Sequence, residues 1–168
     1  MNERACPFPL LPGDALEKRI AALPDRVAAM REKILEAAES RDLNKLRAAI
    51  ERNEVMPLFG KRGKRPKRFA DAIDFLKARS FDGEGGEVFD LLTAILNADY
   101  VLQKRKPVDI FVWPAEAADD TLAQAQSVAQ LYRFVSFADV AQTTKAGLPR
   151  MHRIEIGADG TWHFFAVE

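Results

Sequence analysis

The chain has 168 residues, of which 48% are hydrophobic and 30% charged. This composition suits one globular domain with a buried core and excludes a disordered chain. The 25 basic and 25 acidic side chains cancel, which argues against a strongly basic nucleic-acid-binding domain. The charges are unevenly placed, because residues 1–80 carry 18 basic and 12 acidic side chains and residues 81–168 carry 7 and 13.

Residues 1–24 read as a leader, extended where the prolines cluster and helical from Asp14 to Leu23. The leader lacks the charged-then-apolar order of a secretory signal, and no apolar run approaches the ~18 residues that cross a bilayer. The single cysteine, Cys6, excludes an internal disulfide. We therefore expect a cytoplasmic protein without a membrane span, or a periplasmic one if an upstream signal precedes this sequence.

Apolar side chains at helical spacing predict the helices of residues 25–97. The first runs from Asp25 to a break at Ser40 and Arg41, and Asp42 caps a second that ends near Asn53. Two more are predicted over residues 69–79 and 88–97. The apolar faces of the first and last of these helices consist of Val27, Met30, Ile34 and Ala38, and of Val88, Leu91, Leu92 and Ile95.

Residues 98–150 alternate between strand and helix signals. Tyr100–Gln103 and Val108–Trp113 are β-prone runs that we expect to pair through the turn at residues 104–107. A helix is predicted over Thr121–Val135, and Ser136 is expected to cap a shorter helix that ends at Gly147.

The last 18 residues, MHRIEIGADGTWHFFAVE, predict a β-hairpin around an Asp-Gly pair. A two- or four-residue loop pairs Ile156 with Thr161, whereas a three-residue loop with Gly160 at positive φ pairs Gly157 with Thr161. The side-chain pattern favours the three-residue loop, because one face of the hairpin is then almost wholly apolar. That face holds Ile154, Ile156, Trp162, Phe164 and Ala166, and the opposite face holds Arg153, Glu155, Thr161, His163 and Phe165.

The choice of loop places the two histidines. The disfavoured register brings His152 and His163 to one face as a plausible pair of metal ligands, whereas the favoured register separates them. His152 then lies near the edge of the core face, and His163 points outward. We expect a structural role for both, with His163 the better candidate for ligand binding.

Together these elements predict an α+β fold in which about six helices pack on a small antiparallel sheet made from two β-hairpins. No clear domain boundary appears, and residues 25–168 read as a single domain.

Several phrases together resemble one uncharacterised family of small bacterial proteins. The phrases are AIDFLKARSFDGEGGEVFDLL (72–92), IFVWP (110–114), LYRFVSFADV (131–140) and IGADGTWHFF (156–165). The resemblance covers residues 25–168 and implies a shared fold, with no activity assigned. Members often carry an export signal, which this sequence does not show, and the basic run at 61–68 is not part of the shared pattern.

The segment GKRGKRPKR concentrates six positive charges and could neutralise several phosphates without reading sequence. Few aromatic residues stand beside it to stack on bases, so a solvated loop is the favoured interpretation and weak nucleic-acid binding the alternative. The six residues are Lys61, Arg62, Lys64, Arg65, Lys67 and Arg68.

The loop at residues 82–87 offers three carboxylates, from Asp82, Glu84 and Glu87. Hard cations such as calcium prefer oxygen ligands, but the spacing of a helix–loop–helix calcium site is not met. We favour a helix-linking loop whose acids stabilise the N-terminus of the next helix, and we expect no metal and no cofactor.

Trp113, directly before Pro114, could line a ligand cleft with Tyr132, Phe134 and Phe137, although core packing is the more common role of such side chains. The outward face around His163 is a second candidate place for a ligand. No nucleophile motif, dinucleotide fingerprint or Walker lysine occurs. We therefore predict a non-enzymatic binding or accessory module that recognises a protein or a small ligand. A metal-dependent hydrolase that uses the 82–87 loop with His163 is the least favoured alternative.

Overall fold

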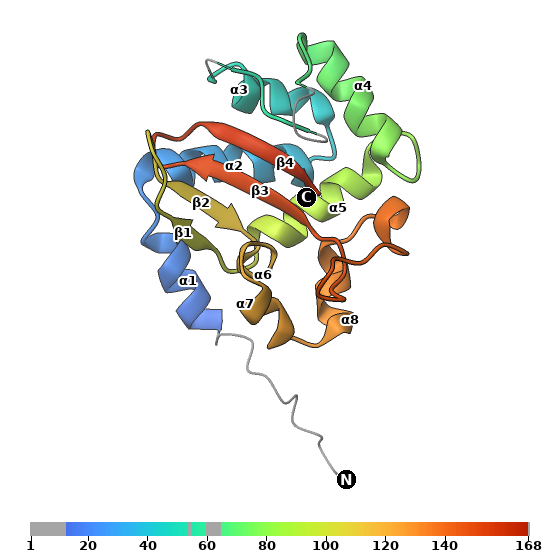
Figure 1. Ribbon diagram of the computed structural model, residues 1–168. Coiled ribbons are helices and arrows are strands. Elements are labelled where there is room, and N and C mark those ends of the chain that lie inside the picture. Colours follow the sequence, from blue (N-terminus) through green and yellow to red (C-terminus); the bar gives the residue numbers. More distant parts are fainter. Residues whose placement is uncertain (1–12, 54, 60–64, 168) are drawn as a thin grey trace.

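The structure is a computed structural model, which describes residues 13–53, 55–59 and 65–167. Four strands form one antiparallel sheet in the order β1–β2–β3–β4, with helices packed around it (Figure 1). The strands are β1 (Val101–Gln103), β2 (Ile110–Trp113), β3 (His152–Gly157) and β4 (Trp162–Val167). Both predicted hairpins are present, β1 with β2 and β3 with β4, which confirms the α+β class.

The helices within the described residues differ in how closely they follow the sequence prediction. Four of them, α1 (Gly13–Ala21), α2 (Asp25–Glu39), α4 (Phe69–Arg79) and α5 (Gly86–Leu96), begin and end within a few residues of the expected positions. The second predicted helix is a short 3₁₀ turn, η1 (Leu43–Lys45), continued by α3 (Leu46–Ile50). As expected, Asp42 caps it, with its carboxylate accepting from the N–H of Asn44 at 2.9 Å.

The core lies between the sheet and the helix pair α2 and α5, which pass behind the strands in Figure 1. Every residue of the two predicted apolar faces is buried. They meet Ile154 and Ile156 of β3 and the indoles of Trp113 and Trp162, all 0% exposed. Each large apolar side chain buried in this way contributes about 1.5–3 kcal/mol, so this interface is the main source of stability.

The first helix, α1, docks beside the start of β1. The guanidinium of Arg19 donates to the carboxylate of Asp99 and, at 2.7 Å, to the carbonyl of Tyr100. The hydroxyl of Tyr100 donates back to the carbonyl of Arg19 at 2.9 Å. The described part of the predicted leader is therefore attached to the domain by reciprocal hydrogen bonds.

The terminal hairpin has the predicted loop. The N–H of Gly157 donates to the carbonyl of Thr161 at 2.8 Å, and Gly160 adopts a φ of 87°. The predicted faces of β4 are wrong from Phe164 onward, because a β-bulge at His163 lets Trp162 pair with Ile156 but Phe164 pair with Glu155. The faces exchange there, so Phe165 enters the core while Phe164 and Ala166 turn to the other side of the sheet.

Two helix predictions are wrong in the segment between β2 and β3. The expected helix over Thr121–Val135 is broken into α7 (Asp120–Gln124), α8 (Val128–Leu131) and the turn η2 (Tyr132–Phe134), because Ser127 takes an extended conformation. The segment after Ser136 forms only η3 (Phe137–Asp139). A bridge between Thr143 and Pro149, with Gly147 at positive φ, satisfies that backbone in place of a helix. The sequence also gave no sign of α6 (Ala115–Ala118).

None of the helices in the described part of the chain combines the length and apolar character needed to cross a bilayer.

Candidate functional site

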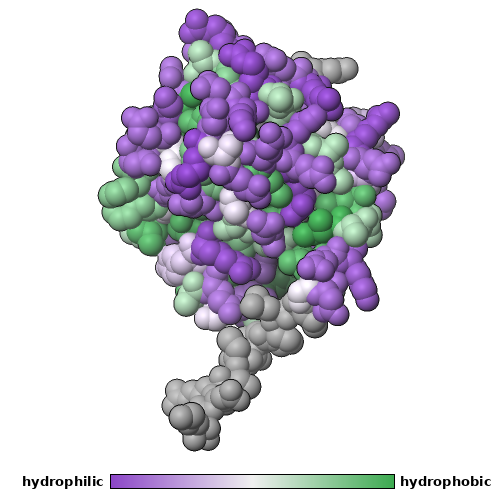
Figure 2. Space-filling model, turned by 180° about the vertical axis from the view of Figure 1, so that it is seen from behind, coloured by the Kyte–Doolittle hydropathy of each residue, from purple (hydrophilic) through white to green (hydrophobic). Residues whose placement is uncertain are grey.

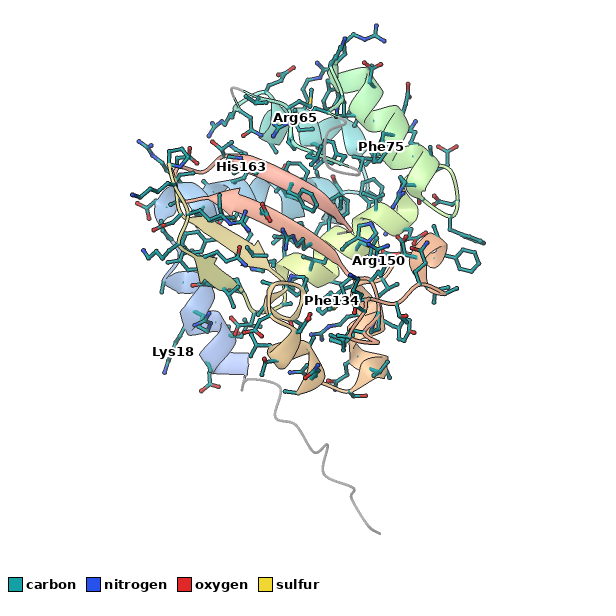
Figure 3. The ribbon with its side chains drawn as sticks, in the orientation of Figure 1. Lys18, Arg65, Phe75, Phe134, Arg150 and His163 are labelled. Atoms are coloured by element: carbon teal, nitrogen blue, oxygen red, sulfur yellow. The ribbon has the colours of Figure 1, made fainter. Side chains whose placement is uncertain are left out.

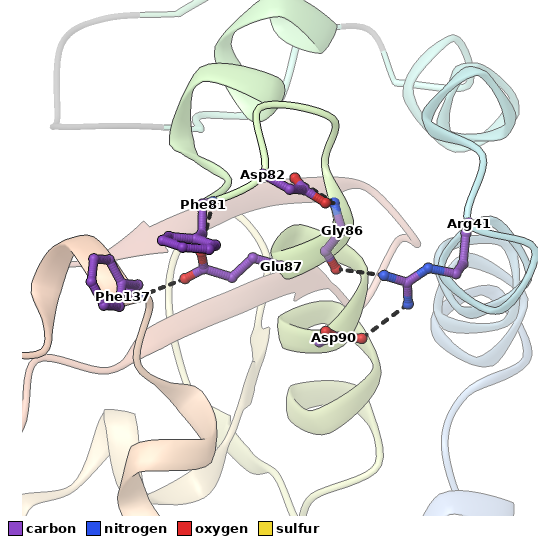
Figure 4. Close-up of a pocket in the computed structure, with 7 residues that line it drawn as sticks. All are labelled: Arg41, Phe81, Asp82, Gly86, Glu87, Asp90 and Phe137. Atoms are coloured by element: carbon purple, nitrogen blue, oxygen red, sulfur yellow. Dashed lines mark hydrogen bonds and ion pairs between the residues drawn. The ribbon is translucent and has the colours of Figure 1, made fainter.

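A pocket of about 360 Å³ lies where the loop between α4 and α5 meets the segment around η3 (Figure 4). The loop is the acidic, glycine-rich stretch that the sequence singled out. The residues that line the pocket are Arg41, Phe81, Asp82, Gly86, Glu87, Asp90 and Phe137.

Asp82 organises the loop by accepting hydrogen bonds from its neighbours. Its carboxylate accepts a hydrogen bond from the hydroxyl of Ser80 at 2.7 Å and from the backbone N–H groups of Glu84, Gly85 and Gly86 at 2.9–3.2 Å. These donors, led by the Ser80 hydroxyl, lower the pKa of Asp82 to about 2. The carboxylate also caps α5, as expected for an acid at a helix N-terminus.

Glu87 joins its own loop to Phe137, which lies 50 residues further along the sequence. One of its carboxylate oxygens accepts the N–H of Phe81 at 2.9 Å, and the other accepts the N–H of Phe137 at 2.6 Å. The two rings meet edge to face with their centroids 5.0 Å apart. They nevertheless stay in solvent, with Phe81 75% and Phe137 67% exposed. We call Phe81, Glu87 and Phe137 the aromatic platform.

Arg41 closes the pocket on the opposite side (Figure 4). It follows α2 at a φ of 53°, and its guanidinium donates to the carbonyl of Gly86 at 3.2 Å and to the carboxylate of Asp90 at 3.0 Å. The same guanidinium lies 5.3 Å from the ring centre of Phe89. The corner after α2 therefore holds the N-terminal end of α5 in place beside the aromatic platform.

Two of the three carboxylates of this loop hold its backbone in place. Asp82 and Glu87 accept hydrogen bonds, and Glu84 is exposed at the surface. Among the described residues, no group of three or more His, Cys, Asp or Glu side chains is placed to hold a metal ion. The two exposed rings can contact an apolar group of a ligand, and the carboxylates that line the same pocket can attract a cation beside that group.

Neither Trp113 nor Tyr132, which were predicted to line a cleft, contributes to the pocket between the α4–α5 loop and η3. Trp113 is fully buried and packs against the rings of Tyr100 and Phe111 at 5.2 and 6.3 Å. Trp113 is buried because β2 lies between β1 and β3 in the sheet, where all four residues of the strand are covered. Tyr132 lies at the surface.

The two histidines lie on opposite faces of the sheet, as the favoured register predicted. His152 is 5% exposed and lies on the core face, 5.3 Å from the ring of Phe165, and burial lowers its pKa to about 4. His163 lines a pocket of about 380 Å³ on the face opposite α2 and α5. We call this the sheet-face pocket; its charged and polar lining residues are Arg65, Arg105, Lys106, Arg153, Glu155 and His163.

His163 and the 82–87 loop line different pockets, so the structure does not bring together the two halves of the hydrolase hypothesis. Within the basic run, Lys61, Arg62 and Lys64 lie outside the described residues. Arg68 forms an ion pair with Asp71 at 2.8 Å, and Lys67 is exposed. Nucleic-acid binding by this run stays a prediction.

The sequence did not identify Phe81 or Arg41 as site residues, and it placed Phe137 in the predicted cleft around Trp113. A signal was present in the phenylalanine directly before the glycine-rich loop, a position where a helix has just ended and a large apolar side chain is poorly covered. Comparison of the chain with models of protein families, with curated proteins and with solved structures found no match.

Proposed function

We propose that this protein is a binding module that docks a segment of a partner protein on the aromatic platform. The observation that carries this is the pair of phenylalanine rings held in solvent by one glutamate. Large exposed aromatic side chains on fixed backbone are typical of the centres of protein interfaces, because they bury much apolar area with little further loss of conformational entropy.

The surrounding charges define the chemistry of the partner. Three carboxylates, from Asp82, Glu87 and Asp90, line the pocket against the single guanidinium of Arg41. The low pKa of Asp82 keeps its carboxylate charged across the physiological range. The partner segment therefore presents an aromatic or aliphatic anchor to the rings and a lysine or arginine to the acids.

The setting of the platform supports a discrete site. Figure 2 shows that hydrophobic side chains reach the helix-covered side of the molecule in separate patches among hydrophilic ones. Near the platform, Val140 is also exposed, three residues beyond Phe137. An apolar patch of this kind, rimmed by charges, is the usual form of a docking site on a soluble protein.

A selection from a library of random 12-residue peptides tests the chemistry of the partner. The full-length protein is the bait, and the Phe81→Ser/Phe137→Ser variant removes background binders. We expect the recovered peptides to share an aromatic or aliphatic anchor with a lysine or arginine within a few residues. Recovery of acidic peptides, or of peptides that bind the double variant equally well, would reject the proposal.

Membership of the bacterial family that the sequence resembles is also proposed. Relatives of this chain would then have the same hairpin loop and the same DGEG loop. The DGEG loop would be preceded in them by a phenylalanine at the position of Phe81.

A further inference from the structure

The sheet-face pocket has cations at its rim and an apolar floor. Its lining includes four cationic side chains but one carboxylate, that of Glu155, among the described residues. Its apolar side chains include Leu58, Ile110 and Phe164. Leu58 extends the sheet, because its N–H donates to the carbonyl of His163 and its carbonyl accepts from Phe165, both at 2.9 Å.

The cations of this pocket come from separate parts of the chain, and two of them approach one carboxylate. Arg153 lies beside Glu155 on β3 and donates to one of its oxygens, and both side chains are less than 10% exposed. Arg105, from the loop between β1 and β2, approaches the other oxygen at 3.5 Å. Arg65 lines the same pocket and is labelled with His163 in Figure 3. Among the described residues of the lining, cationic side chains therefore outnumber carboxylates, and Glu155 faces two of them.

His163 is placed here by the β-bulge, which makes it the extra residue of β4. Its Nε2 atom is buried and has no hydrogen-bond partner among the described residues. A Cβ atom on Gly157 would lie 2.9 Å from this nitrogen, so only glycine at position 157 lets the ring approach the strand so closely. An unsatisfied buried nitrogen costs free energy unless a ligand or water reaches it.

We propose that the sheet-face pocket binds a small organic anion that carries a carboxylate or phosphate group on a short apolar body. Arginine side chains recognise such groups through charge-assisted hydrogen bonds, and the floor of Leu58, Ile110 and Phe164 accepts the body. The sheet-face pocket shares no lining residue with the pocket at the aromatic platform, so a test of one site does not decide the other.

Binding of an anion in this pocket is linked to protonation of His163. The charged groups that face the ring are the carboxylates of Asp159 and Glu155 and the guanidiniums of Arg65 and Arg105. Burial lowers the pKa of His163 in the free protein. A bound carboxylate, whose own charge does not change between pH 6 and 8, raises this pKa again, so its binding takes up protons and is tighter at pH 6 than at pH 8.

Titration calorimetry on the full chain with sodium hexanoate, hexyl phosphate, acetate and 1-hexanol tests the proposal. We expect hexanoate or hexyl phosphate to bind, with about a fourfold gain in affinity for each methylene buried relative to acetate. The alcohol, which lacks the charge, is expected to bind at least tenfold more weakly. Preference for one of the two anions identifies the charged group of the ligand.

Variants assign the binding to this pocket. Arg105→Gln is expected to weaken binding of hexanoate or hexyl phosphate at least tenfold, and His163→Gln to remove the pH dependence of hexanoate binding. Lys104→Gln is the control, because Lys104 lies on the same loop but pairs with Asp109 outside the pocket lining. Equal binding of the alcohol, unchanged binding by Arg105→Gln, or no binding of either anion at millimolar concentration would overturn the proposal. Binding of a single-stranded oligonucleotide, with no binding of either small anion, would also overturn the proposal and would favour nucleic acid as the ligand.

Discussion

Glu87 shows how one side chain can fix two exposed rings. Both of its oxygens accept backbone N–H groups, one from each side of the platform. Hydrogen bonds to a charged acceptor contribute about 1.5–3 kcal/mol each when they are shielded from solvent, and less where water competes. Because the two donors belong to Phe81 and Phe137 themselves, the carboxylate orders the backbone that carries the rings.

Replacing Glu87→Ala is expected to lower the free energy of unfolding by about 1–3 kcal/mol, because two backbone donors lose their acceptor. The more specific effect is local: the amide protons of Phe81 and Phe137 exchange faster with solvent. Hydrogen exchange followed by NMR measures both amides. Glu84→Ala is the control, since Glu84 is an exposed acid of the same loop. Unchanged exchange at both phenylalanines in Glu87→Ala would show that the carboxylate does not hold them.

Gly160 illustrates a backbone position that the sequence does predict. Its φ of 87° is strained for other residues, and a Cβ atom there would lie 2.9 Å from the carbonyl oxygen of Arg26. Gly160→Ala is therefore expected to destabilise the protein by more than about 1 kcal/mol in chemical denaturation. Gly147 has a similar φ of 77° but open space around it, so Gly147→Ala reports the strain alone. Equal losses in the two variants would show that the contact with Arg26 has no cost.

The hairpin of β3 and β4 marks how far the sequence could predict the fold. Its loop follows from Asp159 and Gly160 and the apolar pattern, which are local signals. The bulge at His163 does not, because it depends on packing both Trp162 and Phe165 into the core. The helices α2, α4 and α5 were predictable from their apolar faces, whereas the broken segment from 120 to 139 has too little periodicity to define one helix.

His152 links strand β3 to the pH dependence of stability. Its pKa is about 4 in the folded protein and about 6.5 when solvent-exposed, so the unfolded chain binds more protons between these values. Stability is expected to be complete above pH 6.5 and to fall by roughly 3 kcal/mol as the pH drops to 4.

Urea denaturation between pH 4 and 7 measures this dependence. His152→Phe keeps an aromatic ring beside Phe165 and is expected to lose that part of the slope. The groups that face His152, the carboxylate of Asp139 and the guanidinium of Arg79, stay in place in the variant. A variant whose stability falls as steeply as that of the wild type would exclude His152 as the source.

At the scale of the whole molecule, the sheet separates two surfaces with different properties. Helices α2 and α5 cover one face, while the other carries the ion pair of Arg153 and Glu155 and the sheet-face pocket. The aromatic platform lies at the side, where the α4–α5 loop meets η3. Neither site could be assembled from the sequence, because Glu87 meets Phe137 across 50 residues and Arg105 meets Glu155 across the sheet. The loops that form the two sites could be recognised in the sequence as charged or glycine-rich stretches, but the residues that these loops contact could not.

The most direct test of the docking function is the affinity of a peptide recovered from the selection, measured by fluorescence anisotropy. Val128→Ser is the matched control, because Val128 is also an exposed apolar side chain but lies outside the platform. We predict that Phe137→Ser weakens binding at least tenfold, as truncation of a central aromatic contact usually does, and that Val128→Ser binds like the wild type. Equal affinity of the wild type and Phe137→Ser would contradict the account.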